Sequence, residues 1–294
     1  NTYALVKRLA QIKKLVDQGH GAQFIALAKR INAARYSGGP IPFEPTVFEG
    51  LGNTISNLTI SSGADRSNVG LFDQMNGTVR DIGFVNVNII GFGDDQRVGA
   101  VAGQIDRAGA VLNSFVTGNV SGTGSESLTG AIAGVNTGTI AFSYSSVSVS
   151  VGGGADAVGG LVGINAAGNQ GQYNGAVKES YSTGTVTSGD GAKTGGLVGR
   201  NYGGAISNSY ATGAVAGGNG SLAGGLTGGN TISDSSSPTI ASSYSTGAVT
   251  GGSGATIGGL IGEDLAQTGT TNSYWDLDTS GISDPSHGAG NVQN

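Results

Sequence analysis

The sequence repeats itself every 29 to 36 residues, and this periodicity constrains the fold more than any other feature. In each repeat a large aliphatic residue stands between glycines or other small residues, as in GAVAGQ, GGLVGR and GGLIGE. The aliphatic positions are Leu71, Val101, Ile132, Leu161, Leu197, Leu226 and Leu260. Periods of roughly 20 to 50 residues are typical of solenoids and propellers.

A second motif follows each aliphatic position after a few residues and keeps its phase along the chain. Two of its forms are GAVKESYSTGTV and GAISNSYATGAV, and the last repeat retains only TNSYWDLDTSG, which ends near Gly281. The unequal spacing fits a solenoid, because insertions lie in loops on one face of a repeat array. We interpret NAAGNQGQYNG after Gly163 and TISDSSSP after Asn230 as such loops.

The repeats are predicted to be strands rather than helices. Glycine and β-branched residues each cost up to ~1 kcal/mol relative to alanine inside a helix. Each repeat contains about three candidate strands joined by glycine turns. A propeller is the alternative, but its four-stranded blades need roughly 40 or more residues. The sequence therefore predicts an all-β parallel β-helix of about seven coils, one for each repeat.

Stacking of the coils places like residues in columns along the axis. Because successive strand residues face opposite sides of a sheet, the large aliphatic column is predicted to face the core and the variable residue after it to face solvent. The variable column is Phe72, Ala102, Ala133, Val162, Val198, Thr227 and Ile261.

A column of hydroxyl groups is predicted on the outside of the coils. Its members are Thr117, Ser146, Thr183, Thr212 and Thr246. Such a row satisfies an exposed polar strand face, and it also suits binding to glycans or to ice.

Composition narrows the class of protein. The 294 residues include 57 glycines and 5 prolines without a G-X-Y period, which excludes a collagen helix. The absence of cysteine excludes disulfides, zinc–thiolate sites and thiol nucleophiles. No apolar run reaches the ~20 residues of a transmembrane helix. No signal peptide precedes the repeats, so we interpret the chain as a mature segment or a fragment.

Charge is unevenly distributed along the chain. Residues 1–36 contain seven of the fourteen basic residues and one of the nineteen acidic residues. Residues 37–294 therefore hold seven basic and eighteen acidic residues, a net charge of −11. An acidic body repels phosphate backbones, so no nucleic-acid partner is expected.

The first forty residues are predicted to form a basic helical cap. Between Ala4 and Gln18 apolar residues recur at helical spacing. They are Leu5, Leu9, Ile12 and Val16. The stretch QFIALAKRINA is predicted to be a second short helix or an entering strand. Repeat folds need covered ends, although a basic amphipathic helix also suits an anionic membrane or a partner protein.

Catalytic residues are scarce in the repeats. The two histidines, His20 and His287, lie at opposite ends of the chain, so no histidine-centred acid–base pair or multi-histidine metal site is expected. Polysaccharide-cleaving β-helices need clustered acids, and the early coils offer candidates that also suit solvated loops. They are Asp65, Asp73, Asp81, Asp94, Asp95 and Asp106. No pair has a spacing that selects it, so no catalytic residue and no cofactor are predicted.

One segment after the last coil is similar to a calcium loop. DLDTSGISDPSH places oxygen ligands at Asp276, Asp278 and Ser280 and a glycine at the sixth position. The twelfth position is His287 rather than glutamate, and helical flanks are missing. A turn is therefore favoured over a calcium site.

Three segments carry a resemblance to a known family. They are FEGLGNTISNLTI (48–60), GGLVGRNYGGAISNSYATGAV (195–215) and NSYWDLDTSG (272–281). They resemble the first strand, the core repeat and the closing unit of the GLUG-motif region of filamentous-haemagglutinin-like bacterial adhesins and two-partner-secretion exoproteins. The resemblance covers roughly residues 40–281 and implies a right-handed parallel β-helix in a large secreted protein.

We therefore expect three regions: a helical cap at residues 1–40, a β-solenoid at 41–281 closed by Tyr274 and Trp275, and a tail at 282–294. The resemblance implies a non-enzymatic adhesin or filament segment, secreted to the bacterial cell surface. Its expected partners are a receptor or glycan on a host or neighbouring cell, or further copies of itself. The alternatives are a carbohydrate-active β-helix enzyme, a glycan-binding module and an ice-binding solenoid.

Overall fold

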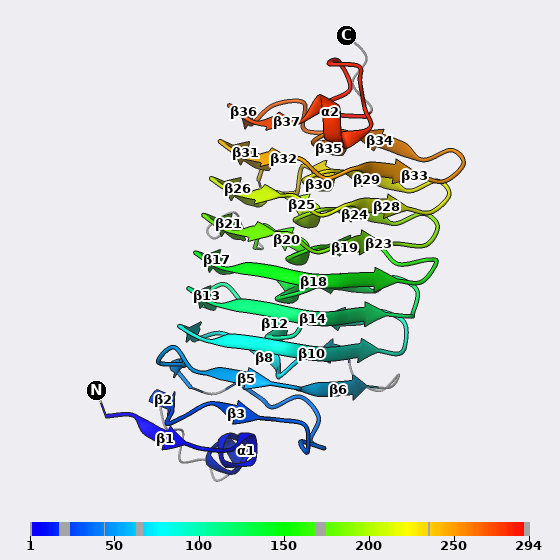
Figure 1. Ribbon diagram of the computed structural model, residues 1–294. Coiled ribbons are helices and arrows are strands. Elements are labelled where there is room, and N and C mark those ends of the chain that lie inside the picture. Colours follow the sequence, from blue (N-terminus) through cyan, green and yellow to red (C-terminus); the bar gives the residue numbers. More distant parts are fainter. Residues whose placement is uncertain are drawn as a thin grey trace.

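The protein is a stack of coils with the N-terminus and α1 (Leu9–Asp17) at one end and α2 (Leu277–Ser280) at the other (Figure 1). The computed structural model describes residues 2–17, 24–43, 45–62, 67–168, 175–234 and 236–290. Within these ranges it is an all-β, right-handed parallel β-solenoid of about seven turns with two short helices. The predicted fold class is confirmed.

Four parallel sheets run along the stack in the described part of the chain. The first sheet contains β1 (Ala4–Val6), β2 (Phe24–Leu27), β4 (Val47–Glu49), β9 (Thr78–Arg80), β13 (Ala110–Leu112), β17 (Thr139–Ala141), β21 (Ala176–Lys178), β26 (Ala205–Ser207), β31 (Thr239–Ala241) and β36 (Thr270–Thr271). The second contains β3 (Ile31–Asn32), β5 (Thr54–Ser56), β6 (Thr59–Ser62), β10 (Gly83–Gly91), β14 (Phe115–Gly122), β18 (Tyr144–Val151), β22 (Tyr181–Ser182), β23 (Val186–Thr187), β27 (Tyr210–Ala211), β28 (Val215–Gly217), β32 (Tyr244–Ser245), β33 (Val249–Gly251) and β37 (Tyr274–Trp275).

The third and fourth sheets are shorter. The third contains β7 (Asn68–Val69), β11 (Arg97–Val98), β15 (Leu128–Gly130), β19 (Ala157–Gly159), β24 (Lys193–Gly195), β29 (Leu222–Gly224) and β34 (Thr256–Gly258). The fourth contains β8 (Phe72–Met75), β12 (Ala102–Ile105), β16 (Ala133–Asn136), β20 (Val162–Ala166), β25 (Val198–Tyr202), β30 (Thr227–Thr231) and β35 (Ile261–Asp264). Each of the seven coils from β4 to β35 passes through all four sheets in turn, whereas the strands before β4 and after β35 add only to the first two sheets.

The aliphatic column lies in the core. Its members Leu71, Val101, Ile132, Leu161, Leu197, Leu226 and Leu260 are each at most 4% exposed. The Leu161 amide donates to the Leu197 carbonyl at 2.8 Å, and the Leu197 amide donates to the Leu226 carbonyl at 2.9 Å. Burial of such a side chain contributes ~1.5 to 3 kcal/mol, so each coil depends on its neighbours for most of its stability.

The residue after each column member is buried as well, so the prediction that it faces solvent is wrong. Val198 is 0% exposed and Ile261 is 2% exposed. A bend at Gly196 and Leu197 divides GGLVG between β24 and β25. Side chains alternate strictly only within a continuous strand, so both residues at the bend reach the interior. The same bend raises the number of strands per repeat above the predicted three, since β24 to β28 come from one repeat.

A row of buried amides also runs through the interior, and the sequence reasoning missed it. Asn136, Asn165, Asn201 and Asn230 are 0% exposed. Successive Nδ2 atoms donate to the next Oδ1 at 2.8, 3.0 and 3.1 Å, and the Asn230 amide donates to the Asp264 carboxylate at 3.0 Å. Each buried polar group is therefore satisfied by its neighbour. The recurring asparagine in GVN, GIN, GRN and GGN is the signal in the sequence.

The N-terminal segment begins with a strand. β1 pairs in parallel with β2, and α1 begins only at Leu9. Leu9, Ile12 and Val16 lie in the main core, whereas Leu5 is 63% exposed. The prediction of a helix from Ala4 onward is therefore wrong in its first turn, because pairing with β2 satisfies that part of the backbone.

The coils begin inside the region expected to be a cap. Of the two alternatives for QFIALAKRINA, the described residues form strands, β2 and β3, and β3 pairs with β5. α1 lies at this end of the stack with Lys7, Arg8, Lys13 and Lys14 exposed (Figure 1). No helix in the described ranges is long and apolar enough to span a membrane.

One of the two aromatic residues near the C-terminus closes the core. Trp275 packs against the main core, but Tyr274 is 66% exposed. The segment expected to be a tail also covers the last coil, because the Gly288 carbonyl accepts a hydrogen bond from the Leu260 amide at 3.0 Å.

Candidate binding surface

Five aromatic rings stack along the second sheet. Their centroids are 5.2 Å apart for Phe115 and Tyr144, 4.8 Å for Tyr144 and Tyr181, 4.7 Å for Tyr181 and Tyr210, and 4.9 Å for Tyr210 and Tyr244. The rings are within 7° of parallel. Because the coils are spaced at about 4.8 Å, identical side chains in one register stack face to face. We call this set the aromatic column.

The aromatic column is half-buried except at Tyr244, which is 42% exposed. Burial raises the pKa of Tyr181, and the neighbouring Tyr144 raises it further. Burial likewise raises the pKa of Tyr210, and Tyr181 and Tyr244 add to the shift. The recurring aromatic in NSF, FSY, ESY and SSY is visible in the sequence, but the sequence reasoning did not single it out.

The predicted hydroxyl column lies two residues after the aromatic column in each coil, within β14 and β18 and directly after β22, β27 and β32. Thr117 pairs with Ser146, and the amides of Thr183, Thr212 and Thr246 each bond to the preceding coil. Ser146, Thr183 and Thr212 are exposed, whereas Thr117 and Thr246 are half-buried. One sheet face therefore presents rings and hydroxyls side by side.

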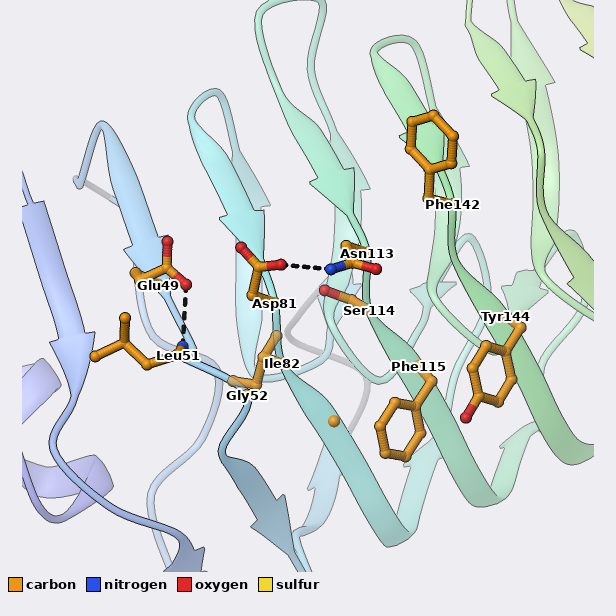
Figure 2. A pocket seen from close by; sticks show the side chains of 11 residues that line it. Glu49, Leu51, Gly52, Asp81, Ile82, Asn113, Ser114, Phe115, Phe142 and Tyr144 are labelled. Atoms are coloured by element: carbon orange, nitrogen blue, oxygen red, sulfur yellow. Dashed lines mark hydrogen bonds between the residues drawn. The ribbon is translucent and has the colours of Figure 1, made fainter.

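A groove opens at the N-terminal end of the aromatic column, at the corner between the first and second sheets (Figure 2). Its volume is about 640 Å³. Four successive coils line it, and its walls include Leu51, Asp81, Asn113, Phe115 and Phe142. We call it the corner groove.

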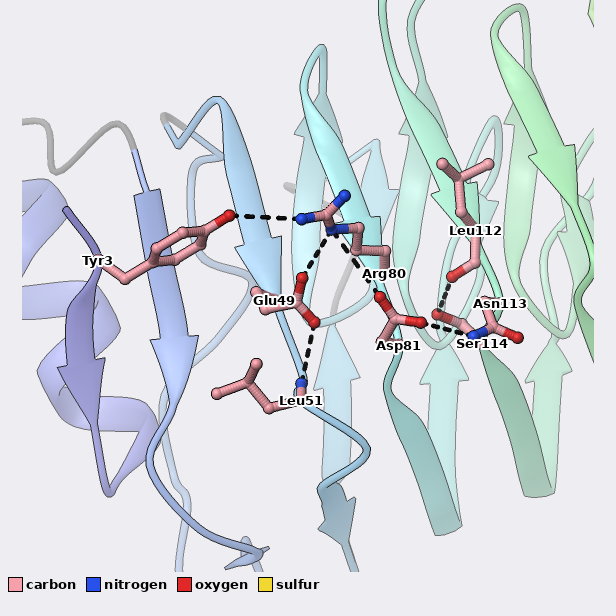
Figure 3. A network of polar contacts seen from close by, with 8 residues as sticks. All are labelled: Tyr3, Glu49, Leu51, Arg80, Asp81, Leu112, Asn113 and Ser114. Carbon is pink, nitrogen blue, oxygen red and sulfur yellow. Dashed lines mark hydrogen bonds and ion pairs between the residues drawn. The ribbon is translucent and has the colours of Figure 1, made fainter. Parts of the chain in front are cut away.

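A polar network lies along one side of the corner groove (Figure 3). Glu49, which is 6% exposed, accepts from Arg80 Nε at 2.6 Å and from the Leu51 amide at 3.0 Å. The hydrogen bond to Glu49 is the main cause of the raised pKa of Arg80. Asp81 lies 3.8 Å from Arg80 Nε and accepts from Asn113 Nδ2 at 2.5 Å. The network therefore fixes Asp81 and Asn113 at the groove.

Two apolar residues of the corner groove have unfavourable backbone conformations. Leu51 has a φ of 53° and Phe142 a φ of 52°, in the left-handed region that bulky residues avoid. Both are exposed, at 61% and 56%. The same corner of later coils carries small or polar residues, Glu179, Asn208, Ser242 and Asn272.

The early acidic residues do not form one cluster. Asp65 lies outside the described residues. Asp106 accepts hydrogen bonds from Gln74 and Gln104 at 2.6 Å each, and Asp94 accepts from the Ser125 amide at 2.8 Å. The carboxylate of Asp73 accepts from the Gln74 amide. Asp95 is exposed in a turn with a φ of 56°. Of the five candidates in the described ranges, Asp81 is the one that lines the corner groove.

The segment that is similar to a calcium loop folds as the N-terminus of a helix. Asp276 caps α2 by accepting from the amides of Asp278 at 2.9 Å and Thr279 at 3.4 Å, which lowers its pKa. Ser280 is 0% exposed and accepts from the Ile282 amide at 3.2 Å. Within the described ranges, no three His, Cys, Asp or Glu side chains are grouped to hold a metal ion.

Comparison with known proteins supports the repeat and the fold. The family model described as the GLUG motif matches residues 191–216. A crystal structure from Bacteroides ovatus, provisionally named an immunoglobulin A1 protease, is 20% identical with a TM-score of 0.58, and the match covers 93% of this chain and 75% of that one. A structure named IgA1 Protease is 18% identical with a TM-score of 0.51, covering 91% of this chain and 21% of that one. No curated protein matches the chain.

These comparisons correct the expectation that the chain is not part of an enzyme. That expectation rested on the resemblance to adhesin repeats and on the lack of a catalytic motif in the sequence. The same fold occurs in two proteins named as proteases, and this chain spans only about a fifth of the second one. The neighbours therefore point to a possible enzyme, at 18 to 20% identity. What the comparisons establish for this chain is a GLUG-containing parallel β-helix.

Proposed function

We propose that the chain is the binding region of a larger secreted bacterial protein and attaches it to a cell or matrix surface. The observation that carries this proposal is the aromatic column beside the hydroxyl column on one exposed sheet face. Tyrosine combines an apolar body with a polar tip, and it is enriched at binding interfaces for that reason. The GLUG match and the fold of the two neighbours support an extracellular location.

The stacked coils make this surface suitable for adhesion. Each coil presents the same groups about 4.8 Å further along the rod. A repetitive partner, such as a cell-surface polymer, contacts several coils at once, and linked contacts raise the overall affinity without any new type of contact. The rings are already ordered by stacking, so little side-chain entropy is lost on binding.

Adhesion is tested with beads that carry the purified chain. We expect them to bind epithelial cells or extracellular-matrix proteins more than albumin-coated beads do, and the double variant Tyr181→Ser, Tyr210→Ser to bind less. Tyr202→Ser is the matched control, because Tyr202 lies on the fourth sheet beside Arg200 rather than in the column. Binding no greater than that of albumin beads on every surface, by a chain that stays monomeric, contradicts the proposal.

A second candidate function is a β-helical region of a secreted protease. The shared fold with two proteins named as immunoglobulin A1 proteases favours it. In this case the sheet face binds the protein substrate for a catalytic region elsewhere in the chain. We expect the isolated region to bind immunoglobulin A1 in a pull-down without cleaving it. Failure to bind immunoglobulin A1 would remove this candidate and leave the first one standing.

A further inference from the structure

We propose that the corner groove binds a neutral oligosaccharide. This inference rests on the adhesive function proposed above and gives it a ligand class and a site. The groove differs from the aromatic column, whose ring faces cover one another and leave only their edges for contact. At the groove the column ends, and apolar side chains are available to a ligand.

Glycine at position 83 ends the aromatic column. Gly83 occupies the position of Phe115 and Tyr144 in the next coils, as the strand pairing shows. A Cβ atom at Gly83 would lie only 2.3 Å from Cζ of Phe115, so the Phe115 ring lies across this glycine. No further ring fits in this register, and the space along the corner stays open as the groove.

The exposed Leu51 and Phe142 point to a ligand. A bulky residue in the left-handed region is strained by about 1 to 3 kcal/mol, and such strain is concentrated at functional sites. Asn208 and Asn272 show that this corner accepts the residue type that favours the conformation. The fold therefore gains nothing from an exposed Phe142 ring, whereas a ligand that packs on the ring does.

The dimensions of the groove favour a chain molecule. It reaches from the coil of Leu51 to the coil of Phe142, which is three coil spacings, or roughly 14 Å. It is open rather than enclosed, and its lining residues follow one another across the coils (Figure 2). A linear ligand can therefore lie along it and leave at both ends.

The polar groups of the groove favour hydroxyl donors. Asp81 is an acceptor with lone pairs beyond the bond from Asn113, and Asn113 is exposed and offers both a donor and an acceptor. The pyranose units of an oligosaccharide have apolar C–H faces, which suit Leu51 at one end of the groove and Phe142 at the other, and hydroxyls, which suit Asp81 and Asn113 between them. A few fixed polar groups among apolar walls are typical of specific small-ligand sites.

The charge of the groove favours a neutral ligand. Glu49 and Asp81 are negative, and Arg80 beside them is positive and held by Glu49. The local charge is therefore slightly negative, which repels sulfated, phosphorylated or carboxylated polymers. Both carboxylate oxygens of Glu49 already accept hydrogen bonds, from Arg80 Nε and from the Leu51 amide. Asp81 is therefore the carboxylate that binds the ligand.

The test is a panel of neutral and anionic oligosaccharides, followed by calorimetric titration of the best neutral binder. We expect the wild-type chain to bind neutral members, and Phe142→Asn to bind them about tenfold more weakly. Asp81→Ala should weaken binding as well. The matched control is Ser242→Asn. It introduces asparagine at the same corner of a later coil, outside the groove, and should bind as the wild type does. Thermal unfolding of each variant separates lost binding from lost folding.

The inference is overturned if no neutral oligosaccharide binds, if only anionic ones do, or if Phe142→Asn binds as tightly as the wild type. An apolar peptide that occupies the groove where glycans do not would also overturn it. The bead assay is read separately. Adhesion that persists without any glycan binding defeats this inference alone, whereas glycan binding without adhesion defeats the proposed function alone.

Discussion

The ring of Phe115 lies across Gly83, so that a Cβ atom at Gly83 would be 2.3 Å from Cζ of Phe115. The two residues occupy the same position in successive coils. Glycine here allows the aromatic column to end in contact with the coil before it. This one relationship fixes where the column stops and where the corner groove begins.

Replacing Gly83 by alanine should therefore destabilise the protein. The added methyl group forces the Phe115 ring to move, and such overpacking costs about 1 to 3 kcal/mol of unfolding free energy. Urea denaturation measures the change. In a Phe115→Ala background the same substitution should cost almost nothing, because the clashing atoms are gone. An equal cost in both backgrounds would show that Phe115 is not the group that requires glycine.

Phe142→Asn should raise the stability of the chain. Asparagine tolerates a φ near 52° far better than phenylalanine does, and the wild-type ring is 56% exposed, so little burial is lost. We expect a gain of about 1 kcal/mol in urea denaturation. The reverse exchange at the same corner, Asn208→Phe, should lose a similar amount. A loss of stability in Phe142→Asn would mean that the ring supports the fold.

Asn201→Ala should be among the most damaging polar substitutions. Asn201 is 0% exposed, accepts from Asn165 at 3.0 Å and donates to Asn230 at 3.1 Å. Removing it takes the Nδ2 donor away from the buried Asn230 Oδ1, at about 1 to 3 kcal/mol. Asn165 Nδ2 loses one acceptor but still donates to the carbonyls of Gly175 and Ala205. The thermal midpoint reports the loss. Asn219→Ala, at an exposed turn, is the control and should change stability by less than about 0.5 kcal/mol.

Alkaline pH should weaken the fold through the aromatic column. The pKa values of Tyr181 and Tyr210 are raised in the folded state, chiefly by burial and also by their stacked neighbours Tyr144 and Tyr244. The folded state therefore holds these protons more tightly than the unfolded state. Stability is at its full value below the unfolded pKa of about 10 and falls as the pH rises above it.

This pH dependence is measured by urea denaturation between about pH 8 and pH 11. The double variant Tyr181→Phe, Tyr210→Phe keeps the stacked rings but removes two of the titrating hydroxyls. Its stability should fall less steeply above pH 10 than that of the wild type. Equal slopes would show that the column does not couple ionisation to folding.

The repeat pattern alone predicted the coil architecture, because the period of the aliphatic column can be measured directly in the sequence. The spacing from Leu197 to Leu226 matches one coil, and these residues are joined through their backbones in the structure. The pattern failed at the Gly196–Leu197 bend, since alternation of side chains is a property of straight strands. It also failed at Leu5, where pairing with β2 prevailed over helical spacing.

The sequence by itself determined the period, the all-β class and the buried aliphatic column, because each depends on residues that recur from one repeat to the next. Only the tertiary structure decided that Leu51, Asp81, Asn113 and Phe142 share one groove. These residues belong to four coils, and stacking brings neighbouring coils to about 4.8 Å whatever their side chains are. A groove forms only where the side chains that meet across the coils leave space between them. Gly83 and Phe115 do so because the glycine has no side chain to continue the aromatic column.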